Sequence, residues 1–450
     1  MAIAREARPQ TWWEELGVPF RGAFADNAAL RPDSPEEQRI QRLRKAVTLK
    51  PGSRYRLSSE RARLVTKSYR QTEGQHPAIR RARAMDAVLR NIPIPLPDEQ
   101  LLLGTPSAGL LAAEVMVEMM AWTQEADTFL DRHDNYSLSD EDRRVFAEEI
   151  IPYWHGKGRG DYALRELETN DPVALAYYRD AGAVIRGVGG PLVHTIQDYN
   201  TILREGLDGV MAQMREDLAS IDGSAPVGIA DLERRNHYRA MLIVADGMIA
   251  YAERCADLAD SAAASEPDPA RAAELREMAR ICRRVPRLPA TTWWEALQSL
   301  HFLRATTTLL EGGGSHSVGR FDQYMLPFLR RDLASGAITL PKAQELLECL
   351  FVKWNEVPVY AAGRGTTSEG MRQNDKLTIG GVTADGNDAT NELSLMCLEA
   401  HAHVHLNDPN ISLRVHRDTP DDLLRRALEV IRLGGGLPQI ISDEAIIPSL

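Results

Sequence analysis

Apolar side chains recur at three- and four-residue spacing through the first two-thirds of the chain, a pattern typical of amphipathic helices. The clearest stripe runs through residues 231–262 and includes Tyr238, Met241 and Cys255. Similar stripes predict helices at residues 112–131, 200–220, 292–308, 341–354 and 389–404. A further helix is predicted to begin after Ser34, because Pro35 and Glu37 complete a capping-box pattern before an apolar stripe.

The final third changes from helices alone to strands that alternate with helices. Strands are predicted at residues 376–383, 410–416 and 439–441, with the helix at 389–404 after the first and a helix capped by Thr419-Pro420 after the second. This order predicts parallel strands joined by crossover helices. We therefore expect an α/β fold in which helices wrap a barrel or sheet. The strand edges at 376–383, 410–416 and 439–441 are expected to be unpaired, so the chain should self-associate.

Composition narrows the class of protein. The 450 residues are 44% hydrophobic, and 53 basic against 64 acidic side chains give a net charge of −11, which argues against nucleic acid as the main partner. No run approaches the roughly 18 apolar residues of a membrane span, and the first residues lack the apolar centre of a signal peptide. Four widely spaced cysteines favour free thiols, so a cytoplasmic location is expected.

Several residues in the last third resemble pieces of catalytic sites. His401, His403 and His405 would share one face of a strand and could chelate a metal, as in a metallohydrolase. They continue a helix, however, where side chains two apart diverge by about 200°, so a helix end rich in histidine is the preferred interpretation and no metal site is predicted. Cys397 and Glu399 diverge for the same reason, and Cys397 is predicted to be a core thiol. Gly312-Gly313-Gly314 is interpreted as a flexible turn.

Two loops remain candidates for ligand contact. His194 follows the glycine-rich segment at residues 187–191 and precedes a helix, which suits close approach to a ligand but also suits a structural or capping role. Ser315-His316-Ser317 precedes Gly319 in a second loop, which could line a pocket or form a turn. Residue types alone leave both alternatives open.

Short stretches spread along the sequence carry a family resemblance. They are residues 60–74, 79–82, 91–94, 152–157, 295–298, 319–325, 376–381, 387–392 and 438–447. In this order the chain resembles the glycyl radical enzymes, the pyruvate formate-lyase-like superfamily, over nearly its whole length. The surroundings of His194 and of His316-Ser317 are most similar to the diol dehydratase, choline lyase, hydroxyproline dehydratase and isethionate lyase branch.

The resemblance implies a fold and an activity. It implies one pyruvate formate-lyase-like domain over residues 1–450, with a helical shell over about 1–370 and the first strand–helix units of a ten-stranded barrel over about 371–450. The implied enzyme is a lyase or dehydratase that eliminates water, an amine or sulfite from a small hydroxylated substrate through hydrogen abstraction by a thiyl radical. His194 is then expected to contact the substrate hydroxyl or the leaving group, and Ser317 to lie in the same pocket.

The resemblance also sets the expected cofactor and partners. Neither the Gly-Cys-x-Glu loop nor the Arg-Val-x-Gly-Tyr loop of the family occurs in these residues, so the reactive cysteine, its glutamate and the glycyl radical domain are expected outside this chain. A radical-SAM activating enzyme, using S-adenosylmethionine and an iron–sulfur cluster, would install the radical. A homo-oligomer and a second chain with the other half-barrel are further expected partners, and the chain alone should be inactive. Formate acetyltransferase-type carbon–carbon cleavage and a non-catalytic helical scaffold are the alternatives.

Overall fold

The computed structural model describes residues 34–131, 136–180, 194–222, 228–312, 314–358, 360 and 374–450. Its helices are α2 (Pro35–Ala46), α3 (Glu60–Gln71), α4 (Pro77–Asn91), α5 (Trp122–Asp131), α6 (Asp140–Val145), α7 (Ile151–Trp154), α8 (Arg159–Asn170), α9 (Pro172–Asp180), α10 (Tyr199–Asp222), α11 (Ile229–Ser265), α12 (Pro269–Arg284), α13 (Trp293–Glu311), α14 (Phe321–Tyr324), α15 (Leu326–Ser335), α16 (Leu340–Lys353), α17 (Glu392–Val404), α18 (Asp421–Arg432) and α19 (Asp443–Ile446). Its strands are β1 (Tyr55–Ser58), β2 (Ala112–Glu114), β3 (Tyr136–Ser137), β4 (Thr195–Ile196), β5 (His316–Ser317), β6 (Gly319–Arg320), β7 (Lys376–Gly380), β8 (Asn410–Val415) and β9 (Gln439–Ser442).

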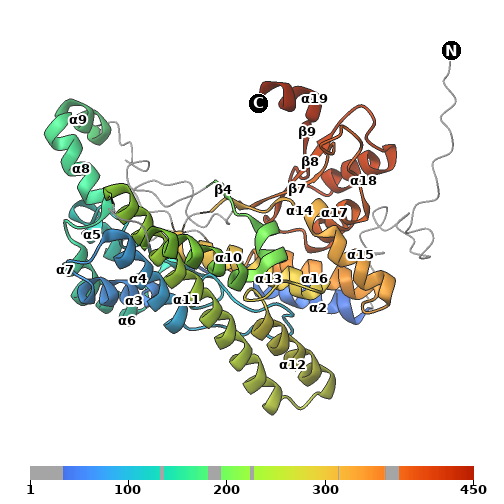
Figure 1. The fold of residues 1–450 in the computed structure, drawn as a ribbon, viewed down its shortest axis with the longest axis horizontal. Coiled ribbons are helices and arrows are strands. Elements are labelled where there is room, and N and C mark those ends of the chain that lie inside the picture. The colour runs from blue at the N-terminus through green and yellow to red at the C-terminus, as the bar shows by residue number, and fades with distance from the viewer. Residues whose placement is uncertain are drawn as a thin grey trace.

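A four-stranded parallel sheet, in the order β6-β7-β8-β9, occupies the C-terminal part of the molecule. Helix α17 connects β7 to β8 and α18 connects β8 to β9, so the predicted alternation of strands and helices is confirmed. Figure 1 shows this sheet at one end of the molecule and helices α3 to α9 at the other. The predicted helix-rich α/β class is therefore confirmed, although the described strands form three separate parallel sheets rather than a closed barrel.

The expectation of free edges along all three C-terminal strands is wrong. Strands β7 and β8 lie inside the sheet and pair on both sides, with residues 376–380 of β7 opposite 410–414 of β8. Among the described strands, β9 pairs only with β8 and forms one edge, while the two-residue β6 forms the other. The predicted self-association stays a prediction, and β9 is the long edge that could carry it.

Strands also occur where the sequence predicted only helices. The predicted helix at 112–131 is wrong in its first part, because residues 112–114 form β2 and pair with β1, and α5 begins only at Trp122. All three residues of β2 are buried. A strand that is buried on both faces loses the alternation of apolar and polar residues that would distinguish it from a buried helix.

The predicted helix starts are confirmed in part. Ser34 is the N-cap of α2, since its hydroxyl accepts a hydrogen bond from the Glu37 backbone nitrogen at 3.1 Å. In a complete capping box the Glu37 side chain would accept a hydrogen bond from the Ser34 backbone nitrogen. Here it accepts one from the Gln41 side chain instead. Thr419 does not cap α18, which begins at Asp421; its hydroxyl accepts a hydrogen bond from the His416 backbone.

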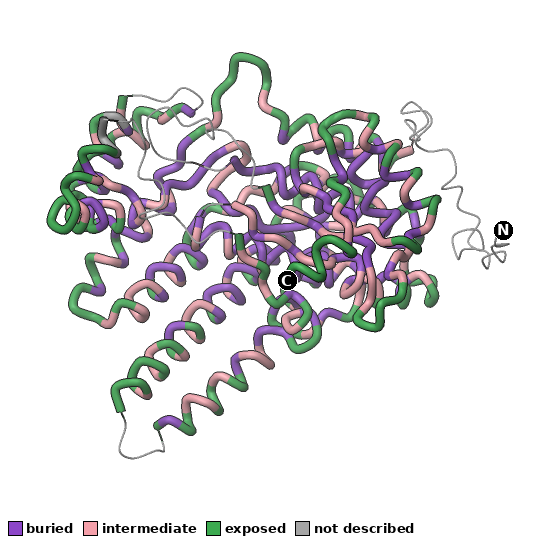
Figure 2. The backbone as a smooth tube through the Cα atoms, turned by 90° about the horizontal axis from the view of Figure 1, so that it is seen from above, coloured by how far each residue is buried: buried purple, intermediate pink, exposed green. Residues whose placement is uncertain are grey.

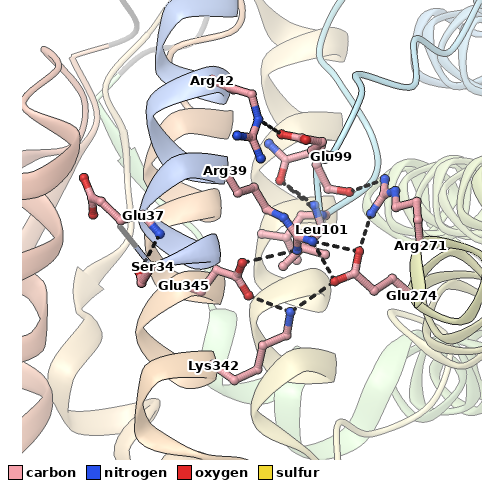
Figure 3. A network of polar contacts seen from close by, with 12 residues as sticks. Ser34, Glu37, Arg39, Arg42, Glu99, Leu101, Arg271, Glu274, Lys342 and Glu345 are labelled. Atoms are coloured by element: carbon pink, nitrogen blue, oxygen red, sulfur yellow. Dashed lines mark hydrogen bonds and ion pairs between the residues drawn. The ribbon is translucent and has the colours of Figure 1, made fainter. Parts of the chain in front are cut away.

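Ion pairs attach α2 to helices that come much later in the chain (Figure 3). Arg39 donates to Glu274 of α12 at 2.8 Å and lies 3.3 Å from Glu345 of α16. Lys342 completes the network, because its Nζ lies 2.6 Å from Glu345 and 3.5 Å from Glu274. Glu345 is buried and the other three side chains are half-buried, so the amphipathic helix α2 is held by directional contacts as well as by its apolar face.

Helix α13 lies where the two hydrophobic cores meet. Trp293, Leu297 and Leu300 belong to the core beneath the C-terminal sheet. Phe302 and Leu309 belong to the core formed with α3, α4 and α11. Figure 2 shows the buried residues concentrated through the middle of the molecule, with exposed residues toward the helix tips. The first half of α13 therefore packs in one core and its second half in the other, and the segment that follows it carries β5.

Asp322 of α14 connects the sheet to α17. Its Oδ2 accepts hydrogen bonds from the Gly380 backbone at 2.7 Å and from the Ser394 hydroxyl at 2.5 Å. The side chain is fully buried, and its Oδ1 has no hydrogen-bond partner. Burial raises the pKa of the Asp322 carboxyl from 3.8 to about 6, and the two hydrogen bonds only partly oppose this effect.

The raised pKa predicts a pH-dependent stability that Asp322→Asn should remove. The folded protein binds the proton more tightly than the unfolded chain, so this carboxyl makes the free energy of unfolding fall as the pH rises from about 4 through about 6. Asparagine retains an acceptor for Gly380 and Ser394 but does not titrate. The free energy of unfolding in urea, measured at intervals between these pH values, should therefore decline less steeply in the variant. Parallel profiles for the two proteins would contradict the assignment, and Asp385→Asn, at an exposed position, is the control.

Candidate substrate site

Two short strands bring the candidate ligand-binding loops together. Strands β4 and β5 pair in parallel, with Thr195 opposite His316 and Ile196 opposite Ser317. His194 immediately precedes β4, so it lies within one residue of this pairing. His194 is exposed and has a φ of 58°, whereas Ser317 is half-buried. Ser317 thus lies on β5 and His194 directly precedes its partner strand β4, although the two residues are more than 120 positions apart in sequence.

Hydrogen bonds define the proton positions on His316. Its Nε2 lies 3.1 Å from the carbonyl oxygen of Gly312, which can only accept, so Nε2 carries the proton. Burial lowers the pKa of His316, which keeps the ring neutral. Its Nδ1 is then the acceptor for the Thr195 hydroxyl at 2.8 Å. The direction of this contact is therefore fixed: Thr195 donates and His316 accepts.

The same chain of hydrogen bonds continues into the helix that follows β4. Gln197 donates to the Thr195 hydroxyl oxygen at 3.0 Å and accepts from the Tyr199 hydroxyl at 2.7 Å. Tyr199, at the start of α10, is buried, and burial raises its pKa well above 10. This hydroxyl therefore stays protonated and acts as a donor. The polar side chains behind β4 and β5 form one oriented network.

Side chains alternate across a strand, so the two faces of the β4–β5 pair differ. Thr195 and His316 point to the face with the hydrogen-bonded network. Ile196 and Ser317 point to the opposite face, where Ile196 is 67% exposed. Ser317 also accepts a long hydrogen bond, 3.4 Å, from the backbone nitrogen of Lys376. Among the described residues, the face that carries Ile196 and Ser317 is therefore more exposed than the face with the hydrogen-bonded network, where His316 is buried.

A buried ion pair connects β5 to the sheet. Asp375, directly before β7, accepts a hydrogen bond from the His316 backbone nitrogen at 2.7 Å and forms an ion pair with Arg304 of α13. Asp408 accepts from the backbone nitrogen of Asp375 at 3.1 Å. Burial, reinforced by the neighbouring charge of Asp375, raises the pKa of Asp408. The network fixes the relative position of α13, β5 and β7.

The histidines at 401, 403 and 405 do not converge on one point. His401 is buried, and its ring packs edge-on against that of His405, with ring centroids 6.3 Å apart. His403 contacts Glu348 of α16 instead, at 2.7 Å. Burial alone would lower the pKa of His403, but the surrounding glutamates raise it to about 9. The geometry of these described residues therefore does not support the less favoured metallohydrolase hypothesis, in which all three histidines bind one metal ion.

Two other sequence interpretations have clear outcomes. Cys397 is fully buried, and burial raises the pKa of its thiol well above 9, so the predicted core thiol is confirmed. Gly312 is more than a flexible turn, because it ends α13 with a φ of 68° and a Cβ there would lie 2.5 Å from Met116. Gly313 and the glycine-rich segment at residues 187–191 lie outside the described residues.

Sequence reasoning missed the residues that support the site. Thr195, Arg304 and Asp375 were not singled out, although Asp375 directly precedes a predicted strand. A polar residue at a strand end is a weak signal by itself, and its partner Arg304 lies in the middle of a helix that is mostly apolar. Their pairing arises from the tertiary contact between α13 and the residue that precedes β7.

Comparisons with known sequences agree with this architecture. A family model described as pyruvate formate lyase-like matches residues 32–450. The isethionate sulfite-lyase of Oleidesulfovibrio alaskensis is 33% identical over 446 residues, which cover 93% of this chain and 53% of the relative. The trans-4-hydroxy-L-proline dehydratase of Clostridioides difficile is 30% identical, with 88% and 50% covered. The chain spans about half the length of the curated relatives it matches.

Solved structures give the same result. The glycerol-bound B12-independent glycerol dehydratase from Clostridium butyricum superposes with a TM-score of 0.83 at 31% identity, over 92% of this chain and 51% of that one. A glycyl radical enzyme from Archaeoglobus fulgidus superposes with a TM-score of 0.80 at 32% identity, over 91% and 52%. In the described parts of the chain, every helix is too short or too polar to cross a lipid bilayer. The chain belongs to the pyruvate formate lyase-like family and has the fold of the glycyl radical enzymes.

Proposed function

We propose that this chain forms the substrate-binding wall of a glycyl radical lyase or dehydratase. The reaction would eliminate water, an amine or sulfite from a small hydroxylated compound. The pairing of β4 with β5 supports the proposal, because His194 directly precedes β4 and Ser317 lies on β5, so the two loops that carry them meet at this pairing. The relatives support it, since their names describe loss of sulfite from isethionate and dehydration of glycerol and hydroxyproline.

The residues of this chain would bind and orient the substrate. His194 would contact the substrate hydroxyl or the leaving group, and Ser317 would donate a second hydrogen bond from the neighbouring strand. The neutral His316, held between Thr195 and the Gly312 carbonyl, would keep β4 and β5 in register beneath them. Two polar contacts of this kind would help to align a small polyfunctional molecule for elimination.

The radical chemistry would come from elsewhere. Glycyl radical enzymes generally use a protein glycyl radical installed by a radical-SAM activating enzyme, and the sequence motifs for the radical and cysteine loops do not occur in these residues. We propose such an activating enzyme as a partner, together with a second copy of the protein in a homo-oligomer. The proposed role of this chain is confined to the site formed by its own residues.

Product analysis tests the reaction class. The protein that contains these residues would be activated anaerobically with a radical-SAM enzyme and supplied separately with isethionate, glycerol, trans-4-hydroxy-L-proline, and pyruvate with coenzyme A. Release of sulfite, or of a dehydrated product, is expected from one of the hydroxylated compounds. Formation of acetyl-coenzyme A from pyruvate, without elimination from any of the others, would overturn the proposal in favour of carbon–carbon cleavage.

Substitution of His194 tests its role in that reaction. We expect His194→Gln to lower kcat/KM by about 10²- to 10⁴-fold, because a positioned proton donor or acceptor contributes a factor of this size. Ser317→Ala should act mainly through KM, since it removes a binding contact. His237→Gln, on the exposed surface of α11, is the matched control and should retain full activity. Equal activity of His194→Gln and the control would remove His194 from the site.

A further inference from the structure

Three helices from distant parts of the sequence converge on one imidazole. His403 of α17 lies with its Nδ1 2.7 Å from Glu348 Oε1 of α16 and 3.8 Å from Glu37 Oε2 of α2. One ligand atom from each of these residues lies within 4.8 Å of the other two. Glu37 and Glu348 are buried and His403 is half-buried. Few solvent molecules can therefore compete for these donor atoms.

A second feature lies on the other side of the same ring. His403 Nε2 has no hydrogen-bond partner, and neither does Oε2 of Glu399, which lies 3.8 Å away. Glu399 is only 4% exposed, and its other oxygen accepts from Arg426 at 2.8 Å. A histidine that binds a metal through one ring nitrogen commonly donates from the other to a carboxylate. The unpaired oxygen of Glu399 lies where such an acceptor belongs.

The charges around the ring favour a cation. Glu37 and Glu348 receive hydrogen bonds from the neutral side chains of Gln41 and Gln344, at 2.7 and 2.8 Å. The neighbouring Arg426 is directed to Glu399 and Glu429 instead. With a neutral His403, two carboxylates would balance the charge of one divalent ion. Mixed imidazole and carboxylate donors suit first-row transition ions such as zinc.

We propose that Glu37, Glu348 and Nδ1 of His403 bind a divalent transition-metal ion, with Glu399 as the hydrogen-bond acceptor for Nε2. Binding would displace the proton on Nδ1 that now bridges to Glu348, and this proton would pass to solvent. Because the three ligands come from α2, α16 and α17, the ion would hold the N-terminal helix against the helices that cover the sheet. The site is distinct from the substrate face of β4 and β5, and its role would be structural. His401 and His405 are not ligands.

Binding of zinc and cobalt to the full chain tests the proposal. After removal of metals with a chelator, calorimetric titration with Zn²⁺ is expected to show one site, with release of a proton, and the midpoint of thermal unfolding should rise with Zn²⁺ concentration. Co²⁺ should give visible d–d absorption typical of a site with nitrogen and oxygen ligands. His403→Gln and Glu348→Gln should each weaken Zn²⁺ binding at least about tenfold.

Matched controls separate this site from adventitious binding. Glu36→Gln and His405→Gln alter a neighbouring carboxylate and a neighbouring histidine, so both should bind Zn²⁺ as the unaltered chain does. Should a ligand variant fail to fold, as judged by circular dichroism, the Co²⁺ spectrum of the unaltered chain still reports the ligands. Absence of stoichiometric Zn²⁺ binding, or equal affinity in His403→Gln and His405→Gln, would overturn the proposal and leave His403 as an imidazolium held by three glutamates.

Discussion

Asp375→Asn is expected to lower the free energy of unfolding by about 3–5 kcal/mol, because it leaves the Arg304 guanidinium buried without its counter-charge. Both side chains of this ion pair are almost completely inaccessible to solvent. Asparagine has nearly the same shape and keeps an acceptor for the His316 backbone nitrogen, which Asp375 now binds at 2.7 Å. The decrease in the free energy of unfolding should therefore measure the effect of the unpaired Arg304 charge, and not the effect of a cavity. Denaturant unfolding followed by circular dichroism measures it.

The same substitution should loosen the candidate substrate site. Asp375 is one of the contacts that join β5 to the strand β7, so hydrogen exchange should become faster in residues 194–196 and 316–317 than in the distant helices α3 and α4. Asp385→Asn, at an exposed position, should change the free energy of unfolding by less than about 0.5 kcal/mol. A loss in Asp375→Asn as small as in this control would show that the buried pair contributes little.

Arg61→Met is the second substitution with a large expected effect. Arg61 is completely buried, and its guanidinium donates to Glu118 at 2.5 and 3.0 Å and to the carbonyl oxygens of Leu309 and Leu310. Burial would raise the pKa of Glu118, but Arg61 outweighs burial and lowers it, so the carboxylate stays charged. Methionine fills most of the volume but removes the main counter-charge of Glu118 and the guanidinium donors to two carbonyls at the end of α13. A loss of about 3–5 kcal/mol in the free energy of unfolding is expected.

The exposed pair of Arg63 with Glu60, one turn of the same helix, gives a matched comparison. Arg63 is about half exposed, so Arg63→Met should change the free energy of unfolding by no more than about 1 kcal/mol. Double replacement of Arg61 and Glu118 by methionine and glutamine should recover part of the loss, because no unpaired charge remains. If the single and double replacements are equally unstable, the loss comes from packing or from the carbonyls and not from the stranded carboxylate.

Local sequence patterns are sufficient to predict the longest helix and the alternating strands and helices of the C-terminal third. The long stripe at 231–262 became α11, and the alternation from residue 376 onward became β7, α17, β8, α18 and β9. Periodicity works here because each element has enough residues to repeat its pattern several times. Strands of two residues, such as β4 and β5, cannot repeat any pattern, so no local signal indicates that they form a sheet.

The arrangement of the candidate site likewise depends on contacts between distant segments. His194 and Ser317 were found by resemblance, but their proximity follows from the pairing of Thr195 with His316 across 121 residues. Helical geometry correctly predicts that His403 and His401 point in different directions. No residue near His403 in the sequence indicates that it contacts Glu37 or Glu348. Contacts between distant segments arise from tertiary packing, which a local pattern does not encode. The family resemblance therefore identifies candidate residues, and only the tertiary structure shows which residues surround them.

The attachment of α2 sets an order of events during synthesis. Arg39 is bound by Glu274, 235 residues later in the chain, and by Glu345, which emerges later still. At ordinary rates of translation, the apolar side of α2 must wait many seconds outside the ribosome before α12 and α16 appear. During that interval the apolar side chains of Ile40, Leu43 and Val47 lack the core partners that later helices supply, so docking of α2 follows the synthesis of residue 345 and does not begin the folding of the chain.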